Sequence, residues 1–213
     1  DATTKSTIDP VLNIFVKEFN RKMGYDDKKP EIAEIERYFD NKGKYEFFKE
    51  EYQKRFGETW ENGRKSILLK LQRVAEIMAE IDGIPQATAF DNIKAQIANY
   101  KIDTDGFVAL VKEHLDKQQP GSRFIFFVDE VGQFIGKDVH RMLSLQTIAE
   151  GLSDKTNGQS IVIVTSQMDI DATLGNLDKQ QEYDFSRIQG RFDTRISLTS
   201  ANADEVIQRR LLE

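Results

Sequence analysis

The stretch RFIFFVDEVGQFIG, residues 123–136, joins a run of apolar residues to two adjacent carboxylates. Five apolar residues, Phe124 to Val128, lead directly into Asp129 and Glu130. The run is rich in β-forming residues and does not alternate with polar ones, which predicts a strand buried on both faces of a sheet. Ligands of open parallel sheets bind beyond the carboxyl ends of the strands, so the place of the two carboxylates indicates a binding site.

The residues after this stretch predict strands and helices in alternation. We expect a helix at about 138–153, a second buried strand in SIVIVTS (160–166), a short helix near 184–191, a third strand in TRISLT (194–199) and a final helix from about Asn202. The order strand, helix, strand, helix, strand is typical of a parallel α/β fold.

The first half of the chain predicts helices only. Apolar residues recur every three to four positions through residues 8–118, and the clearest spacing predicts one helix over 60–81. Pro30 stands where a first helical turn favours proline. We therefore expect a helical part, residues 1–120, followed by an α/β part, residues 121–213.

Composition limits the class of protein. The chain has 213 residues, 39% hydrophobic and 31% charged, which suits a globular protein, and no apolar run approaches the roughly 20 residues of a membrane span. Cysteine is absent, which excludes disulfides and favours a cytoplasmic location, and the two histidines, His114 and His140, are too few for a histidine-rich metal site. A net charge of −6 argues against a generally basic surface, so DNA stays a candidate partner only through a local patch.

Asp129 and Glu130 match the Walker B pattern of P-loop ATPases, in which a buried strand ends in two acidic residues. A nucleoside triphosphate binds together with Mg²⁺, which prefers oxygen ligands, and Asp129 would hold this ion directly or through water. Glu130 would act as the general base that polarises the attacking water. The alternative is an ordinary strand that leaves the core through polar residues, and the dipeptide alone does not decide between the two.

The end of the next predicted strand carries Thr165, Ser166 and Gln167. Many such ATPases place a polar residue there that hydrogen-bonds the γ-phosphate or the attacking water. We assign Ser166 to catalysis and Thr165 and Gln167 to nucleotide binding, with an ordinary strand exit as the alternative.

Three arginines, Arg187, Arg191 and Arg195, lie in SRIQGRFDTRISL. An arginine at the end of the helix before the last core strand is where AAA+ ATPases carry the arginine finger, which neutralises charge in the transition state of a neighbouring subunit. Arg191 is the best-placed of the three, and this role implies a homo-oligomer.

Several segments together resemble the large P-loop ATPase of bacteriophage exclusion (BREX) systems. They are FFVDEVGQFIG, LSLQTIAEGL, IVIVTSQMDIDA, SRIQGRFDTRISLTSANADEVIQRRLL and the earlier GKYEFFKEEYQKRFGETWENGRKSILL. The resemblance implies an AAA+-like P-loop core that uses ATP and Mg²⁺. It also implies a prokaryotic, cytoplasmic protein that acts with other BREX components in phage resistance.

The chain lacks the phosphate-binding motif G-x-x-x-x-G-K-[ST] of such enzymes. Its two Gly-Lys pairs, Gly43-Lys44 and Gly136-Lys137, have neither the first glycine nor the Ser or Thr of this motif. We expect the motif to lie upstream of Asp1, so that the chain is an internal fragment that neither hydrolyses ATP nor holds ATP and Mg²⁺ by itself. Two alternatives stay open: a non-catalytic helical scaffold with a degenerate nucleotide fold, and a P-loop ATPase of a signalling or DNA-segregation class.

Overall fold

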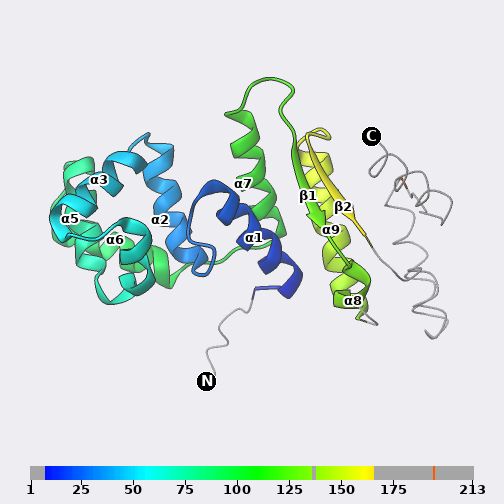
Figure 1. The fold of residues 1–213 in the computed structure, drawn as a ribbon, viewed down its shortest axis with the longest axis horizontal. Helices are drawn as coiled ribbons and strands as arrows, with labels where there is room; N and C mark the ends of the chain where they lie inside the picture. The colour runs from blue at the N-terminus through cyan, green and yellow to red at the C-terminus, as the bar shows by residue number, and fades with distance from the viewer. Residues whose placement is uncertain (1–7, 136–137, 166–193, 195–213) are drawn as a thin grey trace, which may run out of the picture. The chain divides into compact units, whose positions relative to one another are not determined.

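The structure is a computed structural model that describes residues 8–135, 138–165 and Thr194. Most helices of the described chain come before the first strand, and the last two lie between the two strands, as Figure 1 shows. The elements are α1 (Pro10–Met23), α2 (Pro30–Asn41), α3 (Tyr45–Phe56), α4 (Trp60–Gly63), the 3₁₀ helix η1 (Arg64–Leu69), α5 (Leu71–Asp82), α6 (Gln86–Ala98), α7 (Thr104–Asp116), β1 (Phe124–Val128), α8 (Val131–Ile135), α9 (Val139–Lys155) and β2 (Ser160–Val164).

The chain divides into two compact units. The first contains residues 1–128 and 147–164, and the second contains residues 129–146 and 165–213. Helix α9 runs through the boundary at residue 146. The division between a helical and an α/β part at residue 120 stays a prediction.

The ends of the first helices follow local rules of capping. The Asp9 carboxylate accepts hydrogen bonds from the first turn of α1, 2.9 Å from Val11 N and 3.0 Å from Leu12 N. Gly24 ends the helix at φ +80°, a conformation that glycine adopts without strain. Helix α2 begins at Pro30, as its sequence predicts, because proline lacks the N–H that the first turn leaves unpaired.

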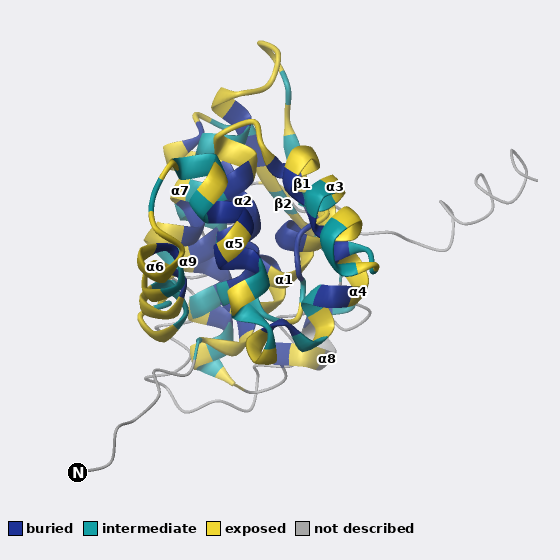
Figure 2. Ribbon diagram, turned by 90° about the vertical axis from the view of Figure 1, so that its left-hand side faces the viewer, coloured by how far each residue is buried: buried dark blue, intermediate teal, exposed yellow. Residues whose placement is uncertain are grey.

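A single apolar cluster holds α2 to α6 together. Its largest fully buried side chains include Phe39, Phe48, Tyr52 and Trp60, with ring centroids of Phe48 and Trp60 4.8 Å apart. Figure 2 shows the buried residues gathered on the inner faces of these helices. Burial of such aromatic side chains supplies most of the stability of a helical domain of this kind.

The prediction of one continuous helix over residues 60–81 is wrong. This stretch is broken into α4, η1 and α5, with non-helical backbone at Ser66 (φ −116°, ψ 19°) and Lys70 (φ −132°, ψ 26°). The Lys29 ammonium donates to the carbonyl oxygens of Arg64 (3.2 Å) and Lys65 (2.6 Å), so a partner distant in sequence satisfies groups that a continuous helix would bond internally.

An aromatic layer joins α1 and α7 to β1. Phe15 and Phe126 have ring centroids 5.1 Å apart, and Phe19 and Phe124 have centroids 5.5 Å apart. Phe107 of α7 lies 5.8 Å from Phe126. One face of β1 is therefore covered by the helices that come before it in the chain.

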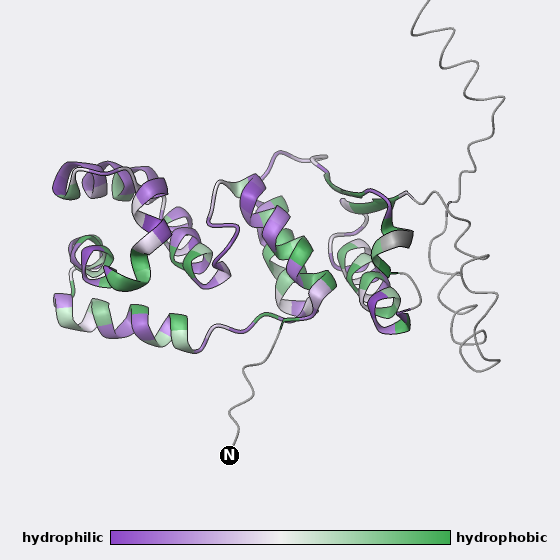
Figure 3. Cartoon of the chain, turned by 60° about the horizontal axis from the view of Figure 1, so that its bottom comes forward, coloured by the Kyte–Doolittle hydropathy of each residue, from purple (hydrophilic) through white to green (hydrophobic). Residues whose placement is uncertain are grey.

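The sheet of the described chain consists of β1 and β2, which pair in parallel from Phe124↔Ser160 to Val128↔Val164. Both strands are almost entirely apolar, as the colouring of Figure 3 shows. Helix α9 makes the crossover between them, as a parallel pair requires. The α/β class and the parallel pairing of these two strands are confirmed.

The prediction that both strands are buried on both faces is wrong. Ile125 and Phe127 are 54% and 63% exposed, and their partners in β2, Ile161 and Ile163, are 37% and 42% exposed. The aromatic layer covers the face of Phe124 and Phe126, and the side chains on the opposite face are partly exposed. None of the described helices combines the length and the apolar composition that crossing a membrane requires.

Candidate functional site

Three sequence-predicted residues meet where the two strands end, and we call Asp129, Glu130 and Thr165 the strand-end site. Asp129 directly follows β1, and Thr165 directly follows β2. Parallel strands present their carboxyl ends at the same edge, so the register that pairs Val128 with Val164 brings these residues together.

The strand-end site is joined by a closed set of hydrogen bonds. The Thr165 hydroxyl donates to Oδ1 of Asp129. The backbone N–H of Glu130 donates both to Thr165 Oγ1, at 3.0 Å, and to Asp129 Oδ1, at 3.1 Å. The N–H of Val131 donates to the carbonyl oxygen of Thr165, at 2.9 Å. Residue 165 thus contacts three consecutive residues at the end of β1.

The backbone of Glu130 is in the left-handed region, with φ +52°. Among the described residues other than glycine, only Asn157 (φ +51°) shares a positive φ, and asparagine tolerates it far better than glutamate. This conformation costs about 1–2 kcal/mol for a residue with a long side chain. Such an outlier persists where neighbouring bonds fix it, and it is a frequent sign of a functional position.

The Asp129 carboxylate is anchored through one of its two oxygens. The residue is exposed, and both hydrogen bonds that reach its carboxylate from the described residues end on Oδ1. The described residues contain no group of three or more His, Asp or Glu side chains that could hold a metal ion. An ion at Asp129 would need water and phosphate oxygens as its other ligands, as is common for Mg²⁺ beside nucleotides, and this role of Asp129 stays a prediction.

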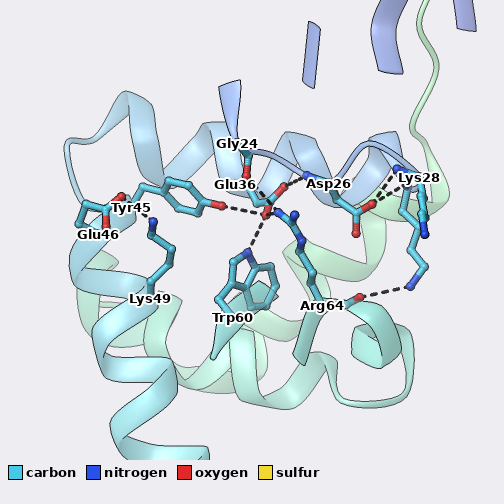
Figure 4. Close-up of polar contacts among 10 residues, drawn as sticks. Gly24, Asp26, Lys28, Glu36, Tyr45, Glu46, Lys49, Trp60 and Arg64 are labelled. Atoms are coloured by element: carbon cyan, nitrogen blue, oxygen red, sulfur yellow. Dashed lines mark hydrogen bonds and ion pairs between the residues drawn. The ribbon is translucent and has the colours of Figure 1, made fainter. Parts of the chain in front are cut away.

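A second polar cluster is built around the buried Glu36 (Figure 4). The Glu36 carboxylate is fully buried and accepts from Asp26 N (2.5 Å), Tyr45 Oη (2.8 Å), Trp60 Nε1 (2.6 Å) and Arg64 Nη1 (2.7 Å). Burial raises the pKa of Glu36, although hydrogen bonds from Asp26, Trp60 and Arg64 act to lower it.

We assign the Glu36 cluster to structure and not to chemistry. Each oxygen of the carboxylate is already engaged by donors from the protein, so the cluster offers no group for a ligand. Sequence reasoning missed it, although one signal was present. Glu36 lies four residues after Ile32 and three before Phe39, on the apolar face of α2, where an unpaired charge is not tolerated.

Five other predicted site residues lie outside the described residues. They are Ser166, Gln167, Arg187, Arg191 and Arg195. Their roles in catalysis, nucleotide binding and subunit contact stay predictions.

Comparison with known proteins gives no family for the chain. No protein-family model matches it. No solved structure matches it either.

Proposed function

We propose that the chain supplies the Walker B end of a P-loop ATPase core. The observation that carries this proposal is the strand-end site. Two adjacent parallel strands bring an exposed carboxylate, a left-handed glutamate and a threonine hydroxyl to one edge of a sheet. That edge is where parallel α/β proteins bind nucleotides.

Each carboxylate of the site has a separate role in this proposal. Asp129 would hold Mg²⁺, which would neutralise charge on the phosphates of the nucleotide. Glu130 orients the attacking water and accepts its proton as general base. Ser166 assists catalysis, Gln167 contacts the nucleotide, and Arg191 acts on the nucleotide of a neighbouring subunit.

The proposal requires a phosphate-binding loop that the 213 residues do not contain. Backbone N–H groups and a lysine must hold the β- and γ-phosphates, and a protein without them binds nucleotide weakly. We propose that this loop comes from a longer parent protein. The resemblance to the BREX ATPase supports a parent that acts in prokaryotic phage resistance, in the cytoplasm, with other BREX components as partners.

The test is Glu130→Gln in the complete protein, with Glu18→Gln as the matched control. Gln keeps the shape of the side chain but cannot take a proton, so ATP turnover should fall at least roughly 100-fold, the usual effect of losing a general base. Affinity for Mg·ATP, measured by calorimetry, should stay unchanged. The control Glu18→Gln makes the same chemical change at an exposed ion pair with Arg21 and should leave ATP turnover intact. Normal turnover in Glu130→Gln would refute the assignment.

A second candidate is a non-catalytic interaction module. The absence of the phosphate-binding motif and the predominance of helices in the described chain favour it. A module of this kind would keep phage resistance with Glu130→Gln, whereas an ATPase would lose it. In a P-loop ATPase of a signalling or DNA-segregation class, Glu130→Gln would abolish ATP turnover and leave phage resistance unchanged.

A further inference from the structure

We propose that Thr165 is a positioning residue, which fixes the Asp129 carboxylate and the Glu130 backbone together and does not contact a phosphate. This differs from the sequence-based assignment of Thr165 to nucleotide binding. The inference rests on the proposed function for what the site binds. The hydrogen bonds that support it all lie between described residues of this chain.

The first step is an account of the hydroxyl group. A threonine hydroxyl has one hydrogen to donate and two lone pairs that accept. In the strand-end site the hydrogen is donated to Asp129 Oδ1, and one lone pair accepts from Glu130 N–H, at 3.0 Å. A phosphate oxygen is an acceptor and would need that same hydrogen. Thr165 cannot donate to a phosphate while it holds Asp129.

The second step concerns the backbone of Glu130. Its left-handed φ of +52° is unfavourable unless neighbouring bonds fix it. The N–H of Glu130 is shared between Thr165 Oγ1 and Asp129 Oδ1, and the next N–H, of Val131, is bonded to the carbonyl oxygen of Thr165. Because φ and ψ set the direction in which a side chain leaves the backbone, the same bonds set the direction of the general base.

The third step concerns the second oxygen of the Asp129 carboxylate. The bonds from Thr165 and Glu130 both end on Oδ1, so they fix the rotation of the carboxylate without occupying Oδ2 in the described part of the chain. A carboxylate with one oxygen anchored in this way presents the other to a cation in a defined orientation. Loss of a partner that orients a metal ligand commonly lowers metal affinity or activity by roughly 10- to 100-fold.

Two substitutions separate the hydroxyl from the rest of the residue. Thr165→Val keeps the branched shape and the carbonyl oxygen that accepts from Val131, and it replaces the hydroxyl with a methyl group. Thr165→Ser keeps the hydroxyl and is the matched control. Thr165→Ala removes the hydroxyl without adding an apolar methyl group, and it serves if the valine variant does not fold.

The first measurement is amide hydrogen exchange at Glu130, followed by NMR in the 213-residue chain. We expect exchange to be roughly fivefold faster or more in Thr165→Val, as for the loss of one hydrogen bond, and near wild type in Thr165→Ser. Unchanged exchange of amides in α5 shows that the variant is folded. If exchange at Glu130 is the same in Thr165→Val as in the wild type, the inference is refuted, whatever the function of the site.

The second measurement is ATP turnover of the complete protein as a function of Mg²⁺ concentration. In Thr165→Val we expect the half-saturating Mg²⁺ concentration to rise, or kcat to fall, by roughly 10- to 100-fold, and Thr165→Ser to restore both. KM for ATP and the preference for ATP over ADP should stay unchanged. Loss of that preference with normal Mg²⁺ dependence would mean that Thr165 contacts the γ-phosphate, and it would overturn the inference.

Asp129→Ala separates failure of this inference from failure of the proposed function. If Asp129→Ala leaves turnover and its Mg²⁺ dependence intact, the Walker B assignment is wrong, and the positioning of a cation ligand falls with it. If Asp129→Ala abolishes turnover and Thr165→Val has no effect, only the inference about Thr165 is wrong.

Discussion

Replacing Arg64 with methionine tests whether burial of the partner, and not the number of ion pairs, decides how much an arginine stabilises this protein. Arg64 Nη1 donates to Glu36 Oε1 at 2.7 Å and to the carbonyl oxygen of Gly24 at 3.1 Å. The Glu36 side chain is fully buried, and that of Arg64 is 19% exposed. Methionine keeps an apolar stem of similar length, so the change removes mainly the charge and its donors.

The expected loss follows from these two hydrogen bonds. A bond that involves a charged group contributes about 1.5–3 kcal/mol, and the longer bond to Gly24 contributes less, which gives about 2–4 kcal/mol. Breaking a buried ion pair costs about 3–5 kcal/mol, and the partial exposure of Arg64 places this case at the lower end. We therefore expect the free energy of unfolding to fall by about 3 kcal/mol.

Arg55→Met is the matched control. The Arg55 side chain is 20% exposed and pairs with three carboxylates, Glu51, Glu76 and Glu80. Glu76 and Glu80 are 46% and 60% exposed, so water already solvates them, and Glu51, which is 16% exposed, keeps its ion pair with Lys54. The loss of stability in Arg55→Met should be well below that in Arg64→Met.

Urea-induced unfolding measures both variants. Trp60, the only tryptophan of the chain, donates to Glu36, so its fluorescence follows the cluster directly, and far-UV circular dichroism gives an independent signal. Arg64 lowers the pKa of Glu36, so its removal should raise that pKa further. The stability of Arg64→Met should then fall as pH rises through the pKa of the folded state, and its deficit should be smallest in acid. A loss in Arg55→Met equal to that in Arg64→Met would refute the reasoning.

Three further predictions concern other parts of the fold. Gly63→Ala should lower the free energy of unfolding in urea by about 1–3 kcal/mol, because the new Cβ would lie 2.5 Å from the buried Tyr52 Oη. A more stable variant would show that the Tyr52 ring moves aside freely. Burial lowers the pKa of His114, so its contribution to the free energy of unfolding should be fully present above pH 6.5 and should decline as pH falls through the folded-state pKa. His114→Gln should remove this decline, and His140→Gln, at an exposed site, should keep it. Phe127→Thr should reduce binding of the dye ANS without lowering the urea midpoint, since the side chain is 63% exposed, and a large drop in the midpoint would mean that the face is covered.

Much of the local structure could be predicted because its causes are local. Asp9 and Pro30 mark the starts of two helices, and the spacing of apolar residues gives the buried face of each. The strand-end site could also be predicted in part. Once two strands are parallel neighbours, the residues that follow them must meet, and this required only the apolar runs that end at Val128 and Val164.

The rest depends on contacts between residues far apart in sequence. The break near Ser66 is accompanied by hydrogen bonds from Lys29, more than thirty positions earlier, to two carbonyl oxygens of this region. The donors to Glu36 come from several separate segments, so no single stretch shows them. The positive φ of Glu130 was not predictable either, because glutamate carries no local preference for it.

The left-handed backbone at Glu130 has a consequence for how the protein can be altered. Glycine adopts this conformation without penalty, so Glu130→Gly relieves about 1–2 kcal/mol of strain. Selection of a random library for thermal stability alone would therefore favour loss of the residue that we assign as general base. Under the proposed function, selection for phage resistance would retain it, at the expense of stability. Position 130 is thus a place where the two selections should diverge, and sequencing both pools would show which property has kept a glutamate there.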